Sequence, residues 1–555
     1  MKWYKQAIGY EIYPYSFMDS DGDGYGDLPG VIAKLDYLSD LGVTLIWLCP
    51  IYESPMDDYG YDVSDFYEVN PLLGNNSDLQ MLLKEAHKRG IRVIMDLVMN
   101  HVSAEHEWFK KAINDPYSPY HDYFIFRKPK YVEGKPKEPN NWMGFFSESV
   151  WTYVPEIDEY YFHIFSSKMP DLNWENPELR EEMYNVARYY LDMGVDGFRM
   201  DAIAHLAKDQ SFEDSSYSTG PVLDTTKFSN RERLFDYLAE FKREVLDKYE
   251  DVLTVGEVGG EASTQTAIRY ASRQNGSLSM VFNFDTCWEN GAYGSMEKSD
   301  DEIRVNLVQM KKLFKKWYDA CHGECDMPLY WVNHDHPRVV SQYGNLNFRE
   351  KSAKMLGTVL LFMYGTPFIF QGEELGMTNV SYDTVEDFFA DVDAVNLVKA
   401  CKDVPEEVLL RFLRRCSRVN ARTPMQWTDD VNAGFTTGKP HIKVNSNYHE
   451  INVKQEKNDS GSVLNHYRKA IALRKKLNRF VVQGSFEIPD IENDDLFIYT
   501  HALDGQEIMV VANFHDKQLR YEVEGDWHIL LSNEESVITE NSLNIDPYGC
   551  FLLKK

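Results

Sequence analysis

The chain has 555 residues, of which 43% are hydrophobic and 14% aromatic, so it is long enough for one large domain and one or two smaller ones. Its formal net charge of −30 argues against nucleic acid or an anionic membrane as a partner and fits a neutral substrate or a bound cation. No apolar run approaches the roughly 18 residues of a membrane span or resembles a signal peptide, so we expect a cytoplasmic protein. The seven scattered cysteines fit reduced thiols.

An acidic loop follows the first expected strand. Glycines between its acids permit a tight turn, and Ca2+ prefers six to eight oxygen ligands. The candidate ligands are the carboxylates of Asp19, Asp21, Asp23 and Asp27 and the backbone carbonyl of Tyr25. Gly30 stands where an EF-hand has its bidentate glutamate. The pattern predicts a cation-binding loop outside the EF-hand class, and the alternative is a solvated acidic turn.

A helix, a glycine and a buried strand repeat along the chain. Helices are expected near 30–41, 77–89 and 177–193, the second opened by a capping box of Ser77 and Gln80, and each is followed by a glycine and an apolar strand. The expected strands are Ala7–Tyr13, Val43–Cys49, Ile91–Leu97, 195–200, Val252–Gly256, Met280–Phe284, Leu329–Val332 and Pro367–Phe370, with further helices near 229–248, 301–318 and 349–362. Eight buried strands alternating with helices predict an α/β fold, a (β/α)8 TIM barrel.

Two stretches interrupt this alternation, and the texture changes near the C-terminus. The segment 102–172 is crowded with aromatic residues and predicts a small inserted domain, whereas 375–430 is charged and helical in character. After a helix over Val463–Leu477, five short alternating segments predict an antiparallel β domain, namely Val481–Ile488, Leu496–Leu503, Ile508–Asn513, Trp527–Leu531 and Gly549–Leu553. We expect barrel domain A over 1–101 and 173–480, domain B over 102–172 and the C-terminal β domain over 481–555.

Charged and histidine side chains follow four of the expected strands. The third strand leads to Asp96, Asn100 and His101, the fourth to Arg199 and Asp201, the fifth to Glu257, and the seventh to Asn333, His334 and Asp335. Barrel enzymes place reactive groups at these strand ends, and two carboxylates across a sugar ring can hydrolyse a glycosidic bond. Arg199 and Asp201 flank Met200 and so point to the same side of their strand, where the arginine would keep the carboxylate ionised.

These motifs resemble a known enzyme family. Asp96-Leu-Val-Met-Asn-His101, Gly197-Phe-Arg-Met-Asp201, Glu257 after Leu253-Thr-Val-Gly, and Val332-Asn-His-Asp335 are similar, in order and spacing, to the four motifs of glycoside hydrolase family 13, the α-amylase family. Ser54–Asp62, Pro170–Asn176, Gly365–Leu375 and Ala421–Trp427 look like the oligo-1,6-glucosidase and α-glucosidase branch. The resemblance covers nearly the whole chain.

The resemblance implies roles for individual residues. Asp201 would be the nucleophile, Glu257 the general acid/base and Asp335 a third carboxylate in a double displacement that retains the α configuration. Contacts to the sugar would come from Asp58, Tyr61, His101, Arg199, His334 and Arg418, with Arg422 as a rival for the role of Arg418. Asp19, Asp21, Asp23, Tyr25 and Asp27 match the calcium loop of the branch, and no organic cofactor is implied.

The expected substrate is a short α-gluco-oligosaccharide, cut from its nonreducing end by an exo-acting retaining α-glucosidase. The resemblance favours α-1,6 linkages, but Ala202 follows the proposed nucleophile where α-1,6-specific members carry Val. The smaller side chain would widen the aglycone side and relax the preference toward α-1,4, so α-1,6 should be favoured by only a modest margin and both linkages can be cut. A transglucosylase or sucrose-isomerase-like enzyme would use the same three acids, a trehalose-6-phosphate-type hydrolase would need a basic cluster, and a non-enzymatic sugar-binding relative usually lacks one acid. A monomer without nucleic-acid or membrane partners is expected.

Overall fold

The computed structural model describes residues 2–146, 149–259, 262–285, 293–535, 538 and 541–555. Cys287 lies outside these residues, and the other six cysteines are free thiols. The chain divides into two compact units: the first is Met1–Trp47, Lys84–Arg92 and Phe284–Lys555, and the second is Leu48–Leu83 and Val93–Asn283. The predicted boundaries of domains A and B therefore stay predictions. Within the described residues, no helix is both apolar enough and long enough to cross a bilayer.

An eight-stranded sheet confirms seven of the predicted barrel strands, whereas the seventh in chain order is the short strand Pro328–Leu329, which shares only Leu329 with the expected Leu329–Val332. The strands are β1 (Gly9–Ile12), β2 (Leu45–Leu48), β5 (Arg92–Val98), β11 (Gly197–Asp201), β12 (Leu253–Glu257), β13 (Met280–Phe282), β14 (Pro328–Leu329) and β15 (Thr366–Phe370). Their order is β13-β12-β11-β5-β2-β1-β15-β14. The pairs β11·β5, β11·β12, β12·β13, β1·β15 and β14·β15 are parallel. The eight strands form a nearly closed (β/α)8 barrel. Because parallel strands point the same way, the residues that end β5, β11 and β12 lie at one edge of the sheet within the second unit.

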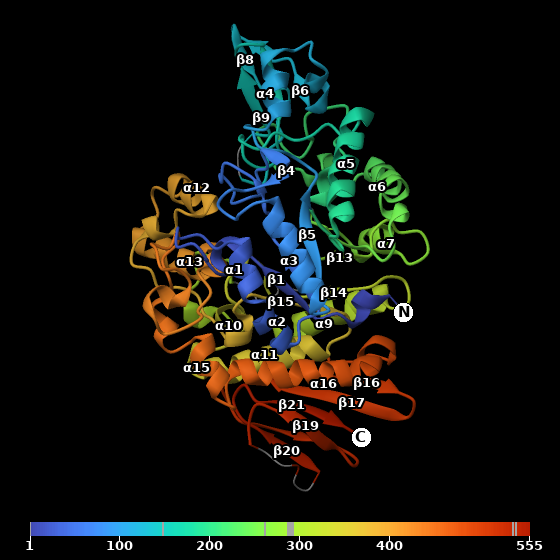
Figure 1. The fold of residues 1–555 in the computed structure, drawn as a ribbon, viewed down its shortest axis with the longest axis vertical. Helices are drawn as coiled ribbons and strands as arrows, with labels where there is room; N and C mark the ends of the chain where they lie inside the picture. Colours follow the sequence, from blue (N-terminus) through green and yellow to red (C-terminus); the bar gives the residue numbers. More distant parts are fainter. Residues whose placement is uncertain (1, 147–148, 260–261, 286–292, 536–537, 539–540) are drawn as a thin grey trace. The chain divides into compact units, whose positions relative to one another are not determined.

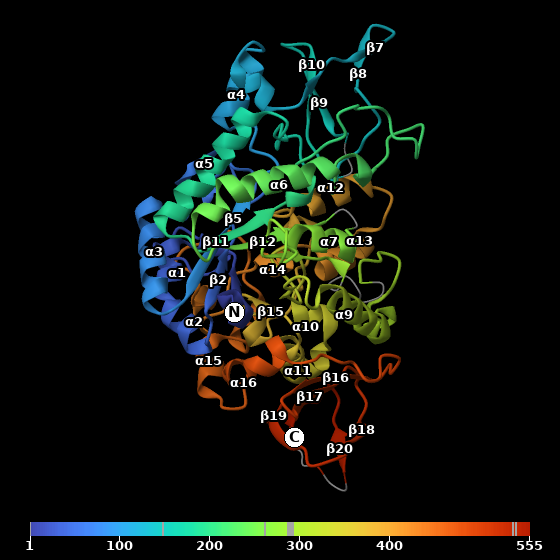
Figure 2. The same ribbon diagram turned by 90° about the vertical axis from the view of Figure 1, so that its right-hand side faces the viewer.

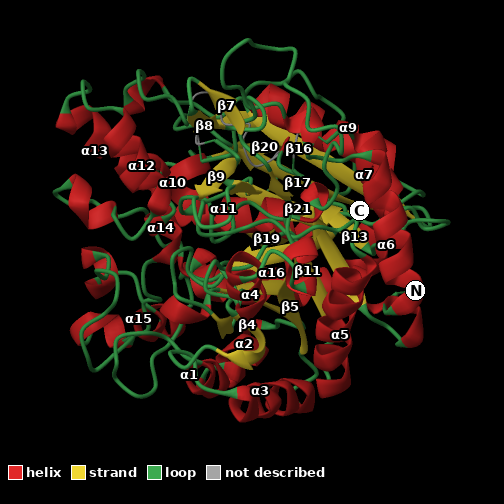
Figure 3. Cartoon of the chain, turned by 90° about the horizontal axis from the view of Figure 1, so that it is seen from above, coloured by secondary structure: helices red, strands yellow, loops and turns green. Residues whose placement is uncertain are grey.

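Four helices follow strands of the second unit or lead into them. They are α3 (Asn76–Lys88), α5 (Pro177–Met193), α6 (Glu232–Glu244) and α7 (Thr264–Ala271), and Figure 3 shows α5 and α6 beside β5 and β11. As predicted, Asn176 caps α5 by accepting from Glu178 N at 2.8 Å, and Gly194 ends it with φ 106°. The capping box at Ser77 was wrong. Asn75 instead accepts from Ser77 N at 2.9 Å, while Asp78 accepts from Asn75 N at 3.0 Å.

The aromatic residues of the insertion pack into a hydrophobic core together with residues that follow it in the chain. The insertion contains α4 (Glu107–Asn114), a hairpin of β7 (Lys130–Val132) and β8 (Lys135–Lys137), and an antiparallel sheet in the order β6-β10-β9 (Phe126–Arg127, Glu159–Phe162 and Trp151–Val154). Figure 2 labels α4, β7, β8, β9 and β10, and Figure 1 labels β6. A short pair, β3 (Tyr52–Glu53) and β4 (Asp65–Val69), precedes it. Trp142, Trp151 and Phe162 pack with Phe212 and Phe228, which lie outside 102–172. The rings mainly fill this core.

The first unit carries the remaining barrel helices and the second insertion. The expected helix near 30–41 is divided at Lys34 into α1 (Leu28–Ala33) and α2 (Leu35–Leu41), because Lys34 has a non-helical ψ of 4°. The others are α9 (Leu307–Cys321), α10 (Val339–Tyr343), α11 (Arg349–Phe362) and α15 (Val453–Asn458). The insertion is helical as predicted, with α12 (Val392–Ala400), α13 (Glu406–Cys416) and α14 (Val419–Arg422).

The C-terminal β region follows one long helix, α16 (Val463–Gln483), which lies along the sheet in Figure 1. The sheet has the order β16-β17-β21-β19, with β18 paired to β20. The strands are β16 (Leu496–Leu503), β17 (Gln506–Asn513), β18 (Leu519–Glu522), β19 (His528–Ser532), β20 (Ser542–Ile545) and β21 (Cys550–Lys554). The expected strand over Val481–Ile488 was wrong. Val481 is buried on the apolar face of α16 and extends that helix, and only Glu487 bridges Thr500.

Candidate active site

One buried guanidinium in the second unit holds three carboxylates together. Arg199, on β11, donates from Nη1 to Asp96 Oδ1 at 2.5 Å and to Asp201 Oδ1 at 2.6 Å. Its Nη2 lies 2.9 Å from Glu257 Oε2. The prediction that Arg199 and Asp201 share a side of their strand is confirmed. The arginine is buried among these acids, and its charge-assisted hydrogen bonds fix the directions of their side chains. Its predicted contact with the sugar stays a prediction.

The environment of Asp201 shifts the pKa of its carboxyl group. Burial raises the pKa of Asp201 above its usual value, the positive charge of Arg199 lowers it, and the negative charge of Asp96 raises it again. The net shift is upward, and Glu257 lies within hydrogen-bonding reach of the same carboxyl group. Two carboxyl groups this close are suited to retaining hydrolysis, since inverting enzymes need room for a water molecule between them.

Ala202 contributes through its backbone. It has the left-handed conformation φ 47°, ψ 27°, which turns the chain sharply after the strand and aims its N–H at Glu257 Oε2, 2.9 Å away. A left-handed conformation is costly for a residue with a β-branched side chain. Position 202 therefore fixes the proposed acid/base directly, an effect that the reasoning from side-chain size did not include.

The other predicted substrate residues of the second unit lie beside these acids or near them in the chain. Tyr61 Oη is 3.5 Å from Asp96 Oδ2, and the guanidinium of Arg199 lies 5.8 Å from the centre of its ring. Asp58 is buried in the same loop, where its carbonyl accepts from Tyr61 N at 3.1 Å. His101 packs edge-on against Phe165, and burial lowers its pKa to about 4. His101 is therefore neutral at pH 7.

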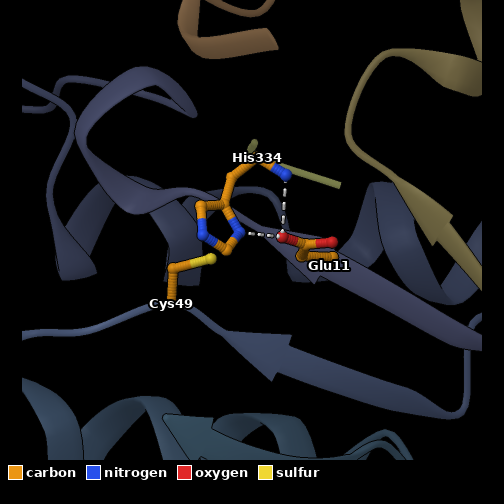
Figure 4. Close-up of side chains that lie close together, drawn as sticks. All are labelled: Glu11, Cys49 and His334. Atoms are coloured by element: carbon orange, nitrogen blue, oxygen red, sulfur yellow. Dashed lines mark hydrogen bonds and ion pairs between the residues drawn. The ribbon is translucent and has the colours of Figure 1, made fainter. Parts of the chain in front are cut away.

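In the first unit, His334 lies between two carboxylates. Its Nδ1 is 2.7 Å from Glu11 Oε1, which also accepts from the backbone N–H of His334 at 3.2 Å (Figure 4). Its Nε2 lies 3.1 Å from Asp335 Oδ2, and its ring stacks on Tyr13. The structure therefore brings His334 and Asp335 together, with Glu11 as an orienting partner that the sequence reasoning missed.

Two arginines face the same aspartate. Arg422 Nη2 lies 2.8 Å from Asp335 Oδ1, and Arg418 Nη1 lies 3.5 Å from it. Burial alone would raise the pKa of Asp335, but the charges of His334, Arg422 and Arg418 hold it well below its usual value. The side chain of Arg422 is 1% exposed and that of Arg418 14%, which makes Arg418 the more accessible of the two rivals. Asp391 holds Arg418 Nε at 3.1 Å, a contact that the sequence did not reveal.

The acidic loop brings together some of the oxygen ligands that suit Ca2+. Asp19, Asp21 and Asp27 each offer an oxygen within 4.8 Å of the others, whereas Asp23 is not part of this group. Burial and neighbouring aspartates raise the pKa values of Asp23 and Asp27. Asp19 accepts from three backbone N–H groups and from Thr436, and the ring of Tyr25 stacks on His441. Asp27 also caps α1 through Gly30 N.

Comparisons with known proteins agree with this architecture. Residues 11–484 match the family described as the catalytic domain of alpha amylase. The oligo-1,6-glucosidase of Parageobacillus thermoglucosidasius is 43% identical over 97% of this chain and 94% of its own length. The solved trehalose-6-phosphate hydrolase of Bacillus licheniformis has a TM-score of 0.92 and 38% identity, covering both chains fully. Isomaltulose synthase from Klebsiella sp. LX3 has a TM-score of 0.93 and 34% identity, over 100% of this chain and 99% of its own. The chain belongs to the α-amylase family of glycoside hydrolases.

Proposed function

We propose that this enzyme is an exo-acting, retaining α-glucosidase that releases glucose from the nonreducing ends of short α-gluco-oligosaccharides. The observation that carries the proposal is the guanidinium of Arg199, shared by Asp201 and Glu257. It keeps two carboxyl groups as close neighbours, as the two-step chemistry of retaining glycosidases requires. The full-length similarity to an oligo-1,6-glucosidase supports the choice of substrate class.

In this mechanism Asp201 attacks the anomeric carbon while protonated Glu257 gives its proton to the leaving glycosidic oxygen. A covalent glucosyl-Asp201 ester forms and the aglycone departs. Glu257, now ionised, takes a proton from water, which attacks the same carbon and releases α-glucose and free Asp201. In the first unit Asp335, held by His334 and Arg422, takes the role of the third carboxylate.

We also propose a structural Ca2+ bound by the acidic loop, with Asp19, Asp21 and Asp27 as the carboxylates that lie closest together. Asp23 and the Tyr25 carbonyl are the remaining proposed ligands. The enzyme is proposed to act as a monomer in the cytoplasm. Size-exclusion chromatography with light scattering measures the molar mass in solution and so tests whether the enzyme is a monomer.

The linkage preference is proposed as α-1,6 over α-1,4. The test measures kcat/KM for isomaltotriose and maltotriose by glucose release, and follows the anomer first released by proton NMR. A higher value for isomaltotriose and initial α-glucose are expected. Initial β-glucose would overturn the retaining mechanism, and a maltotriose preference would overturn the linkage assignment.

Two other reactions are outcomes of the same experiment. Faster turnover of trehalose 6-phosphate than of either trisaccharide would favour a phosphosugar hydrolase, the activity named for one structural relative. Conversion of sucrose to an isomer with little glucose release would favour an isomerase, as named for another. The proposal expects hydrolysis of the trisaccharides to exceed both.

A further inference from the structure

A buried lysine near the carboxylates has no role in the mechanism above. Lys208 has 1% of its side chain exposed and contacts three oxygens from three segments of the second unit. Its Nζ lies 2.8 Å from Asp171 Oδ2, 2.8 Å from Asn100 Oδ1 and 2.5 Å from the carbonyl oxygen of His205. Burying an ammonium is costly unless it is paired, and Lys208 has two hydrogen-bond acceptors, Asn100 and His205, and one ion-pair partner, Asp171.

The contact with Asn100 fixes the direction of that side chain. Lysine can only donate, so the Asn100 atom that faces Nζ must be the carbonyl oxygen. The amide nitrogen then points the other way, and Asn100 Nδ2 lies 3.3 Å from His101 Nδ1. An amide N–H2 can only donate, so Nδ1 of the histidine must accept.

A neutral imidazole carries one proton. Burial lowers the pKa of His101 to about 4, so the ring is neutral when the enzyme is at neutral pH. With Nδ1 as acceptor, the proton sits on Nε2. That nitrogen is buried and makes no hydrogen bond of normal length and angle to the described residues, and the backbone of Tyr61 is close enough to the ring to raise its pKa against the effect of burial.

We propose that Lys208, acting through Asn100, sets the tautomer of His101 so that Nε2–H is presented as a hydrogen-bond donor to a sugar hydroxyl oxygen. Lys208 and Asn100 are therefore positioning residues. The donor role toward sugar rests on the proposed function, whereas the tautomer itself does not.

Asp171 holds Lys208 in place. It is fully buried, pairs with Lys208 and accepts from Ile164 N at 3.2 Å through Oδ1. Asp171 also bridges His101 in an antiparallel backbone pair. Burial lowers the pKa of Lys208, and the negative charge of Asp171 opposes that shift and ties the lysine to the segment that carries the histidine. The Pro170–Asn176 motif acquires a physical reason from this contact.

The first experiment is long-range proton–nitrogen NMR on enzyme with 15N-labelled histidines, without substrate, between pH 6 and 8. The His101 signal is assigned by its loss in His101→Gln. We expect Nε2 protonated, Nδ1 unprotonated and no titration across this range. A proton on Nδ1 in the wild-type enzyme would overturn the inference, whether or not the enzyme hydrolyses α-glucosides.

The second experiment replaces Asn100, the side chain that connects Lys208 to His101, so that the opposite tautomer is favoured. In Asn100→Asp the carboxylate can accept from Lys208 but cannot donate to His101, so Nδ1 should become protonated and the His101 pKa should rise. Lys208→Met combined with Asp171→Asn removes both charges, leaves Asn100 free to rotate and should give a mixture of tautomers. This pair serves as the test where Asn100→Asp does not fold.

Kinetic measurements test whether His101 donates a hydrogen bond to the sugar. In Asn100→Asp we expect kcat/KM for isomaltotriose to fall about tenfold, the size of one lost hydrogen bond. Lys227→Met, which breaks the 3.1 Å pair with Asp209, the residue next to Lys208, is the matched control and should change neither the tautomer nor the rate. A reversed tautomer with unchanged kcat/KM would overturn the donor role and leave the proposed hydrolysis intact.

Discussion

Arg199 Nη1 lies 2.6 Å from Asp201 Oδ1, and the same nitrogen lies 2.5 Å from Asp96. One guanidinium nitrogen therefore serves the proposed nucleophile and a carboxylate that has no step in the reaction. Because Asp96 competes for this positive charge, it limits how strongly Arg199 can favour ionised Asp201. The reactivity of Asp201 depends on a partner on the neighbouring strand.

Replacing Asp201 by Asn should abolish turnover. The amide has the same shape but is a poor nucleophile, so kcat should fall on the order of 10³-fold or more. Glucose release from isomaltotriose measures this. Asp196→Asn, at the other end of the strand region, is the matched control: Asp196 accepts from Val93 N at 2.8 Å and should be replaceable without loss of rate. Wild-type activity in clean Asp201→Asn protein would refute the assignment.

Replacing Asp96 by Asn should move the acidic limb of the pH profile. The negative charge of Asp96 raises the pKa of Asp201, so its removal should lower that pKa and shift the acidic limb of kcat/KM to lower pH, by about one unit or less. Arg199 keeps Asp201 and Glu257 as partners, so its charge stays paired. An acidic limb that stays in place, or moves to higher pH, would show that Asp96 does not control Asp201.

Replacing Ala202 by Val should lower both stability and rate. At φ 47° a β-branched residue costs about 1–3 kcal/mol, and relief of that strain would pull the N–H away from Glu257. We expect a lower Tm and a lower kcat on isomaltotriose and maltotriose alike. Ala202→Gly is the matched control, because glycine tolerates this conformation, and it should keep the rate and the Tm. Unchanged Tm in the Val variant would mean that the backbone adapts.

The sequence predicted the acids at the strand ends but not how they are connected. Alternation along one strand placed Arg199 and Asp201 on one side, because side chains two residues apart share a face. The contact between Arg199 and Asp96 depends on register, which pairs these two residues across β11 and β5. Register between parallel strands is set by distant packing, and no local pattern encodes it. Glu257 reaches the same guanidinium from the opposite neighbour, β12.

The other features that the sequence did not predict correctly have local causes. Lys208 lies in an irregular loop, so its burial follows no periodic pattern and its charge resembles that of a surface lysine. Asn75 and Ser77 are both good helix caps, and sequence alone gave no reason to prefer the earlier one. Val481 extends the apolar face of α16 at helical spacing, although a short apolar run there also fits a strand.

Removal of the proposed Ca2+ should lower the stability of the enzyme and leave the catalytic acids Asp201, Glu257 and Asp335 in place. Asp19, Asp21 and Asp27 would repel one another more strongly without a cation, so chelation with EDTA should lower the Tm and added Ca2+ should restore it. Asp21→Asn keeps the side-chain bond to Asp23 N but removes one charge, and should weaken Ca2+ binding measured by calorimetry on chelated protein. Asp40→Asn, an exposed change on α2, should leave the affinity unchanged. If the chelated protein takes up no Ca2+ and melts at the same temperature, the loop is a hydrogen-bonded acidic turn, stabilised by the N–H groups that Asp19 already accepts from.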